Sequence, residues 1–160
     1  MESFHTLENA RTPLDGRSAV TRKWEEAADA GFQLVPDVLL KNQSVLGITA
    51  TELVVLLNLT MHWWYPTQRP FPRSTTIAKR MGVEVRTVQR ALNHLIELEL
   101  IKRVTVKTES RESTVIDLGG LVSQLRELAI EDAAYMPRLA AKSVEAGADA
   151  PDSHPKKLKG

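Results

Sequence analysis

The sequence of 160 residues contains no cysteine. This absence excludes disulfide bonds, thiolate zinc sites, iron–sulfur clusters and a cysteine nucleophile. The first residues lack the basic and then apolar order of a signal peptide, and no apolar run approaches the roughly 20 residues of a membrane span. We therefore expect a cytoplasmic protein without a membrane partner.

Patterns that indicate catalysis or small-ligand binding are also missing. The four histidines, at positions 5, 62, 94 and 154, are not spaced as metal ligands, and the eight glycines match no phosphate-binding loop. Aromatic residues make up only 5% of the chain, and we interpret their main cluster as core rather than as a ligand pocket. That cluster consists of His62, Trp63, Trp64, Tyr65 and Phe71. We expect no enzymatic activity, cofactor, metal or small-molecule ligand.

Charge of one sign is not in excess over the whole chain, where 21 Lys and Arg face 20 Asp and Glu. The distribution is uneven, however. Between positions 69 and 111 there are ten basic and four acidic residues, a local net charge of +6. The flanking segments carry the compensating −5. A local positive region within a neutral chain is what binding to phosphates predicts.

Apolar residues, 42% of the chain, are enough for a compact core, and their spacing predicts mainly helices. Pro36 suits the start of a helical turn that reaches about Lys41 and is followed by a break at Gly47. Thr49 and Glu52 have the spacing of a capping box, and apolar positions three and four apart follow them. These positions predict a helix over about 50–64.

The segment 74–95 has the pattern of two short helices joined by a tight turn. Ser74 is expected to cap the first helix, and Gly82 ends it. Val88, Leu92 and Leu95 mark the buried face of the second helix. Two β-branched runs, 101–107 and 113–118, then predict a hairpin with a five-residue loop.

A last helix is expected after Gly120, with one apolar seam and an end or kink at Pro137. The seam either packs on the preceding domain or pairs with a second subunit, and we favour a homodimer. Its residues are Val122, Leu125, Ala129, Ala133 and Met136. We expect four parts: an arm at 1–31, partly disordered, with a short helix capped by Ser18 and carrying Trp24; a domain at 32–118; a dimerisation helix at 119–139; and a disordered tail at 140–160.

Two helices around a glycine turn, followed by a hairpin, fit helix-turn-helix geometry. With the runs FQLVPDVLL and PFPRSTTIAKRMGVEVRTVQRALNHL, the sequence resembles the winged helix-turn-helix domains of bacterial transcription regulators and of plasmid and phage replication proteins. The resemblance implies a mainly α fold with a small β-hairpin wing, here with an additional C-terminal helix. Glu84 and Glu99 depart from the family pattern, since a small capping residue and a glycine are usual there.

Double-stranded DNA is the expected partner. The polar face of the second helix carries side chains suited to base edges in the major groove, namely Arg86, Thr87, Gln89, Arg90 and Asn93. Phosphate contacts are expected around the first helix and on the wing. The candidates are Arg73, Ser74, Thr75, Thr76, Lys79, Arg80, Lys102, Arg103, Lys107 and Arg111.

The sequence thus favours a transcription regulator of a bacterium or mobile element, associated with the nucleoid or a plasmid. One alternative is a replication initiation or partition protein that binds repeated sites. An alternative of another class is an adaptor whose winged domain binds protein.

Overall fold

A computed structural model describes residues 16–65, 67, 69–132 and 135–148, and the chain divides into two compact units, Met1–Leu34 and Val35–Gly160. In the first unit, α1 (Gly16–Trp24) is followed by a 3₁₀ helix (Glu25–Ala30). Helix α1 begins two residues before Ser18, so the predicted cap at Ser18 is wrong. Trp24 is 59% exposed and lies below the Lys23 ammonium, 5.6 Å from ring centre to Nζ. The disorder predicted before position 16 and after position 148 lies outside the described residues.

The second unit begins with two short helices. Pro36 is the N-cap of α2 (Asp37–Lys41), and α3 (Gln43–Leu46) ends at Gly47. Gly47 has φ 73°, in the left-handed region, and its N–H reaches the carbonyl groups at the start of α3. Both the helical turn and the break predicted for this segment are confirmed.

Helix α4 (Ala50–Thr60) begins with the predicted capping box. The Glu52 N–H donates to Thr49 Oγ1 over 3.2 Å, and the Thr49 N–H donates to Glu52 Oε2 over 2.8 Å. The helix ends four residues earlier than predicted, and an irregular segment follows. Trp63 packs half-buried against the core, but Trp64, Tyr65 and Phe71 are 67%, 68% and 70% exposed. Placing these three in the core is therefore wrong, because they lie beyond the helix whose period suggested a buried face.

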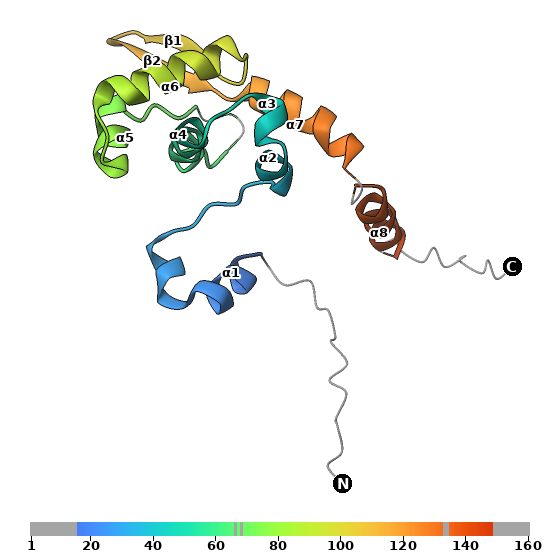
Figure 1. Ribbon diagram of the computed structural model, residues 1–160. Helices are drawn as coiled ribbons and strands as arrows, with labels where there is room; N and C mark the ends of the chain where they lie inside the picture. Colours follow the sequence, from blue (N-terminus) through green and yellow to red (C-terminus); the bar gives the residue numbers. More distant parts are fainter. Residues whose placement is uncertain (1–15, 66, 68, 133–134, 149–160) are drawn as a thin grey trace, which may run out of the picture. The chain divides into compact units, whose positions relative to one another are not determined.

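Helices α5 (Ser74–Met81) and α6 (Val85–Glu97) pack against each other, and α6 also packs on α4 (Figure 1). Gly82, with φ 66°, ends α5 as predicted. The N-cap of α5 is Arg73 and makes no side-chain cap bond, so the predicted cap at Ser74 is wrong by one residue. The three helices share one apolar core, to which α4 gives Val55, Leu56 and Leu59, α5 gives Ile77 and Ala78, and α6 gives Val88, Ala91, Leu92 and Leu95.

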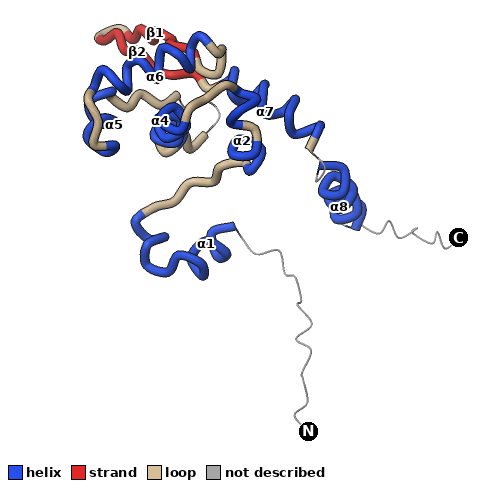
Figure 2. Tube along the Cα trace, in the orientation of Figure 1, coloured by secondary structure: helices blue, strands red, loops and turns tan. Residues whose placement is uncertain are grey.

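Strands β1 (Lys102–Thr108) and β2 (Arg111–Asp117) form an antiparallel hairpin, the one sheet among the described residues (Figure 2). Thr108 pairs with Arg111, so the turn has two residues rather than the predicted five. The Pro70 carbonyl accepts a 2.8 Å hydrogen bond from the Ile116 N–H, which holds the irregular segment before α5 beside β2. The hairpin is thus connected to the helices in two ways: β1 follows α6 in the chain, and β2 is bonded to the segment before α5.

The C-terminal region contains two helices where one was predicted, α7 (Gly119–Glu131) and α8 (Tyr135–Ala148). Pro137 lies in the first turn of α8, where its missing N–H removes no helical hydrogen bond, so an end or kink at Pro137 is wrong. Helix α8 also covers 140–148, for which disorder was predicted. No described helix is long and apolar enough to cross a membrane.

The residues predicted for a dimer seam do not lie on one open face. Leu125 is buried in the core together with Leu121. Val122 and Met136 are exposed, Ala129 is half-buried, and Ala133 lies outside the described residues. Ile96 and Leu98 at the end of α6 pack against the same core.

Candidate nucleic-acid interface

Helix α6 has one buried and one exposed face. Val88, Leu92 and Leu95 are buried, whereas four predicted base-contacting side chains point to solvent: Arg86, Gln89, Arg90 and Asn93. Thr87, the fifth, is half-buried. Arg86 and Arg90 lie one turn apart, and neither pairs with a carboxylate among the described residues. The exposed face therefore offers free guanidinium and amide donors, the groups that bind guanine and adenine edges.

Both ends of α6 are set by backbone geometry. Glu84 is the N-cap but makes no side-chain cap bond, which leaves its carboxylate free at the helix start. After the helix, Glu99 has φ 58°, and this left-handed turn lets the Leu100 N–H reach the Leu95 carbonyl. The sequence departure at Glu99 thus coincides with a position where glycine costs less strain. The chain leaves α6 toward β1 at this point.

A close contact between two side chains, which the sequence did not reveal, joins α6 to α4. His94 Nδ1 lies 2.7 Å from Oε1 of the nearly buried Glu52. Burial raises the pKa of the Glu52 carboxyl, but the Thr49 N–H and His94 outweigh this and hold the pKa below its ordinary value. The residues are 42 positions apart, so only the capping-box signal at Glu52 was visible in the sequence. His94 therefore helps to position α6 against α4. It is not simply one more polar residue late in α6.

Arg80 is positioned by α4 in a similar way. Its Nη1 donates to Oδ1 of the buried Asn58 over 3.4 Å and lies 3.2 Å from His62 Nε2. Asn58 in turn donates to the Val54 carbonyl within α4. Asn58 and His62 therefore hold Arg80 at the end of α5, although Arg80 remains exposed. The sequence did not indicate a positioning role for either residue.

The other predicted phosphate contacts surround α5 and the hairpin. Arg73, Thr75, Thr76 and Lys79 are exposed, and Ser74 is half-buried in the first turn of α5. On the hairpin, Lys102, Arg103, Lys107 and Arg111 are all exposed. Lys107 lies 3.8 Å from Glu112, a surface pair of little energetic weight. The structure thus brings these cations onto exposed positions of the two elements that flank α6.

The base of the hairpin is fixed by a second carboxylate. Asp117 accepts a 2.8 Å bond from the Gly119 N–H and a 3.0 Å bond from Arg69 Nε. Both bonds lower the pKa of Asp117, and the bond from Gly119 has the larger effect. Arg69 is thereby committed to structure rather than to a ligand. Among the described residues, no group of three or more acidic or histidine side chains is arranged to hold a metal ion.

A family match covers the segment that contains α5 and α6. Residues 46–101, which span α4 to the end of the α6–β1 junction, match the family described as a helix-turn-helix domain. A solved structure titled as transcriptional regulator PA3341 matches with 20% identity and a TM-score of 0.37, over 82% of this chain and 95% of that one. No curated protein matches significantly. Residues 46–101 are thus similar to a helix-turn-helix domain, and the β1–β2 hairpin follows directly after the matched segment.

Proposed function

We propose that this protein is a sequence-specific double-stranded DNA-binding transcription regulator, with α6 in the major groove. The observation that carries the proposal is the exposed donor face of α6 opposite its fully buried apolar face. In helix-turn-helix proteins the second helix of the motif enters the groove. Arg86, Thr87, Gln89, Arg90 and Asn93 are the proposed base contacts.

Phosphate contacts on both sides of α6 fix its orientation in this proposal. The start of α5 presents backbone N–H groups and hydroxyls, which suit a phosphate oxygen. Arg80, held by Asn58 and His62, presents a guanidinium whose rotamer is already restricted. The wing contributes the phosphate contacts Lys102, Arg103, Lys107 and Arg111. The DNA that the protein binds in this proposal belongs to the nucleoid or to a plasmid.

The direct test selects bound fragments from random DNA and then measures affinity by fluorescence anisotropy. Arg90→Ala should lose about 1–3 kcal/mol of specific binding, because a base contact is removed while the fold stays intact. Arg126→Ala, a change of an exposed cation on α7, is the matched control and should bind as the wild type does. Equal affinity of the Arg90→Ala protein and the wild type would overturn the role of α6.

We also propose that the active form is a homodimer, because two copies double the contacts and read two half-sites. Of the predicted seam, Val122, Ala129 and Met136 remain partly or fully accessible. Sedimentation equilibrium should give twice the chain mass for the wild type and a lower mass for Val122→Glu with Met136→Glu. A monomeric wild type at micromolar concentration would contradict the dimer.

The selected site also decides between regulation and the alternatives. One inverted repeat fits a dimeric regulator, whereas tandem repeats would fit replication or partition. No described feature favours those alternatives or a protein-binding adaptor. The resemblance to bacterial regulators supports the regulatory role.

A further inference from the structure

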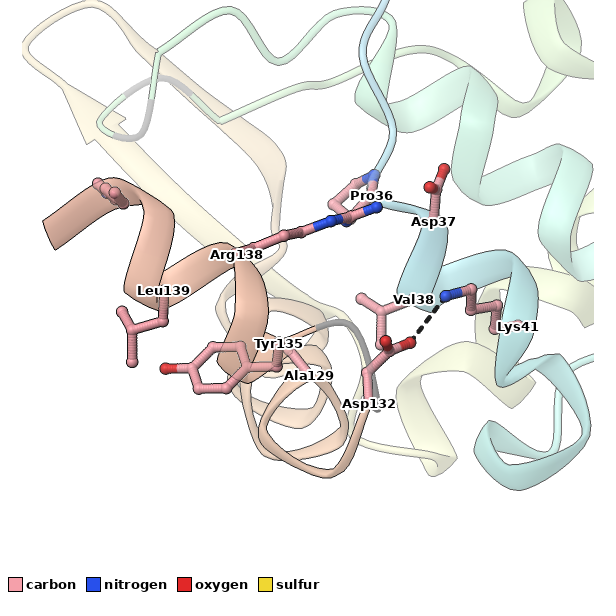
Figure 3. A pocket seen from close by; sticks show the side chains of 10 residues that line it. Pro36, Asp37, Val38, Lys41, Ala129, Asp132, Tyr135, Arg138 and Leu139 are labelled. Atoms are coloured by element: carbon pink, nitrogen blue, oxygen red, sulfur yellow. Dashed lines mark hydrogen bonds and ion pairs between the residues drawn. The ribbon is translucent and has the colours of Figure 1, made fainter. Parts of the chain in front are cut away.

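A cavity of about 440 Å³ opens between α2, α7 and α8 (Figure 3). This volume lies in the range of small-molecule sites, roughly 300–1,000 Å³. None of the lining residues belongs to α5, α6 or the hairpin. The cavity is therefore separate from the proposed DNA-binding face.

The cavity has an apolar wall. Val38 of α2 packs half-buried against the domain core, and Tyr135 and Leu139 of α8 also line the cavity. Figure 3 shows that Tyr135 and Leu139 project from the same side of α8. Such a wall suits an aromatic ring or a short hydrocarbon chain, because removal of apolar surface from water stabilises the bound state.

The charged residues of the lining leave a positive excess. Lys41 Nζ and Asp132 Oδ2 are 2.8 Å apart, so these two groups neutralise each other and join α2 to the end of α7. Arg138 and Lys142 pair with no carboxylate among the described residues, and Asp37 is the one other acid of the lining. In Figure 3 the Arg138 side chain extends from α8 toward Pro36. Two cations against one acid favour an anion.

We propose that this cavity binds a small organic anion. Its apolar body packs on Val38, Tyr135 and Leu139, and its carboxylate or sulfonate is bound by Arg138 and Lys142. The Arg138 fork donates two parallel hydrogen bonds to such a group, which gives both affinity and orientation. Binding at this site does not depend on the proposed function in DNA binding.

The site is connected to the end of α6 through α7. The Leu121 N–H donates to the Leu100 carbonyl over 2.7 Å, and Gln124 Nε2 donates to the Leu98 carbonyl over 3.0 Å. A ligand that fixes α8 and α2 against α7 thus contacts the helix that is bonded to the chain directly after α6. This arrangement suits a ligand that regulates the winged domain.

The test measures binding of anilinonaphthalene sulfonate by its fluorescence, with full-length protein and no DNA. Wild type should bind the probe saturably, and Arg138→Gln should bind it about tenfold more weakly, because one charge-assisted contact is lost. Asp37→Asn should bind it more tightly, since a like charge is removed. Arg126→Gln removes an exposed cation outside the cavity and should leave the affinity unchanged.

A neutral probe separates the charge from the apolar wall. N-phenylnaphthylamine has the same rings without the sulfonate, so Arg138→Gln should not change its affinity. The proposal is overturned if the sulfonate probe does not saturate, if Arg138→Gln and Arg126→Gln bind it equally, or if Arg138→Gln weakens both probes alike. Circular dichroism of each variant checks that the fold is retained. Because these assays contain no DNA, a negative result for the cavity does not bear on the proposed DNA binding. A negative result for DNA binding likewise does not bear on the cavity.

Discussion

Glu52 is bonded to two helices through its two carboxylate oxygens. Oε2 accepts from the Thr49 N–H at the start of α4, and Oε1 faces His94 Nδ1 of α6. The side chain is nearly buried, so few other groups are available to satisfy its charge. The start of α4 and the position of α6 therefore depend on one carboxylate.

Replacing Glu52 by Gln keeps the shape and removes the charge. We expect the free energy of unfolding to fall by about 1–3 kcal/mol, because the charge-assisted bond to His94 becomes a neutral one. Urea unfolding followed by circular dichroism measures the loss. Glu127→Gln on the exposed face of α7 is the control, and a loss of the same size there would contradict a special role for Glu52.

The same pair gives a pH dependence with a defined sign. The pKa of Glu52 is lower in the folded protein than its ordinary value of 4.5. Its contribution is therefore fully present above pH 4.5 and is lost as pH falls through the folded pKa. The stability difference between wild type and Glu52→Gln should shrink over about pH 5 to pH 3. A difference that grows in this range would contradict the assignment.

Glu99 shows strain at a single residue. A left-handed conformation costs an L residue about 1–2 kcal/mol, and glycine avoids most of that cost. Glu99→Gly should therefore raise the free energy of unfolding by about 1 kcal/mol. Glu97→Gly lies at the last residue of α6 and should lower the free energy of unfolding, because glycine has a low helix propensity. Two changes of the same sign would show that φ at position 99 does not limit stability.

At the scale of elements, the contact between α7 and the α6–β1 junction leaves no room for a side chain at Gly120. A Cβ there would lie 1.9 Å from the Glu99 carbonyl oxygen, so α7 or the junction must move. Gly120→Ala should cost about 1–3 kcal/mol, as overpacking does. Gly119→Ala is the comparison and should cost less, because its Cβ meets only the Asp117 side chain at 2.9 Å, whose displacement weakens the bonds from the Gly119 N–H and Arg69 but moves no backbone. Urea unfolding of both variants compares the two sites.

The elements of the winged domain were predictable because each has a local signal. The capping box at Thr49, the left-handed Gly82 and the period of Val88, Leu92 and Leu95 all correspond to observed geometry. The polar face of α6 followed from the same period. These signals depend on residues within a few positions of one another.

The features that sequence reasoning missed depend on contacts between distant residues or on context. The Glu52–His94 pair and the hold of Asn58 on Arg80 join residues 42 and 22 positions apart. Composition rich in Ala and charge suggested disorder after position 140, although Ala and Lys are also good helix formers. For Trp64, residue type favoured the core, but the end of α4 at Thr60 placed it in solvent.

At the scale of the whole molecule, the near-zero net charge conceals a positive winged domain. Eight of the ten cations of positions 69–111 lie on α5, α6 and the hairpin, and Arg69 and Arg73 lie in the segment before α5. All ten are exposed. Arg69 is bound to Asp117 and Arg80 to the amide of Asn58, so the remaining cations carry most of the free charge. The acidic flanks reduce the attraction of the whole chain to unrelated polyanions.

This charge distribution predicts a steep salt dependence despite a net charge of +1. The logarithm of the association constant for DNA should fall linearly with the logarithm of salt concentration, with a slope of about −0.9 per phosphate contact. Arg103→Ala on the wing should make the slope shallower by about 1, whereas Arg126→Ala should not change it. Anisotropy titrations from about 50 to 200 mM salt measure the slopes. A slope near zero would mean that the net charge, rather than the local positive region, governs the encounter with DNA.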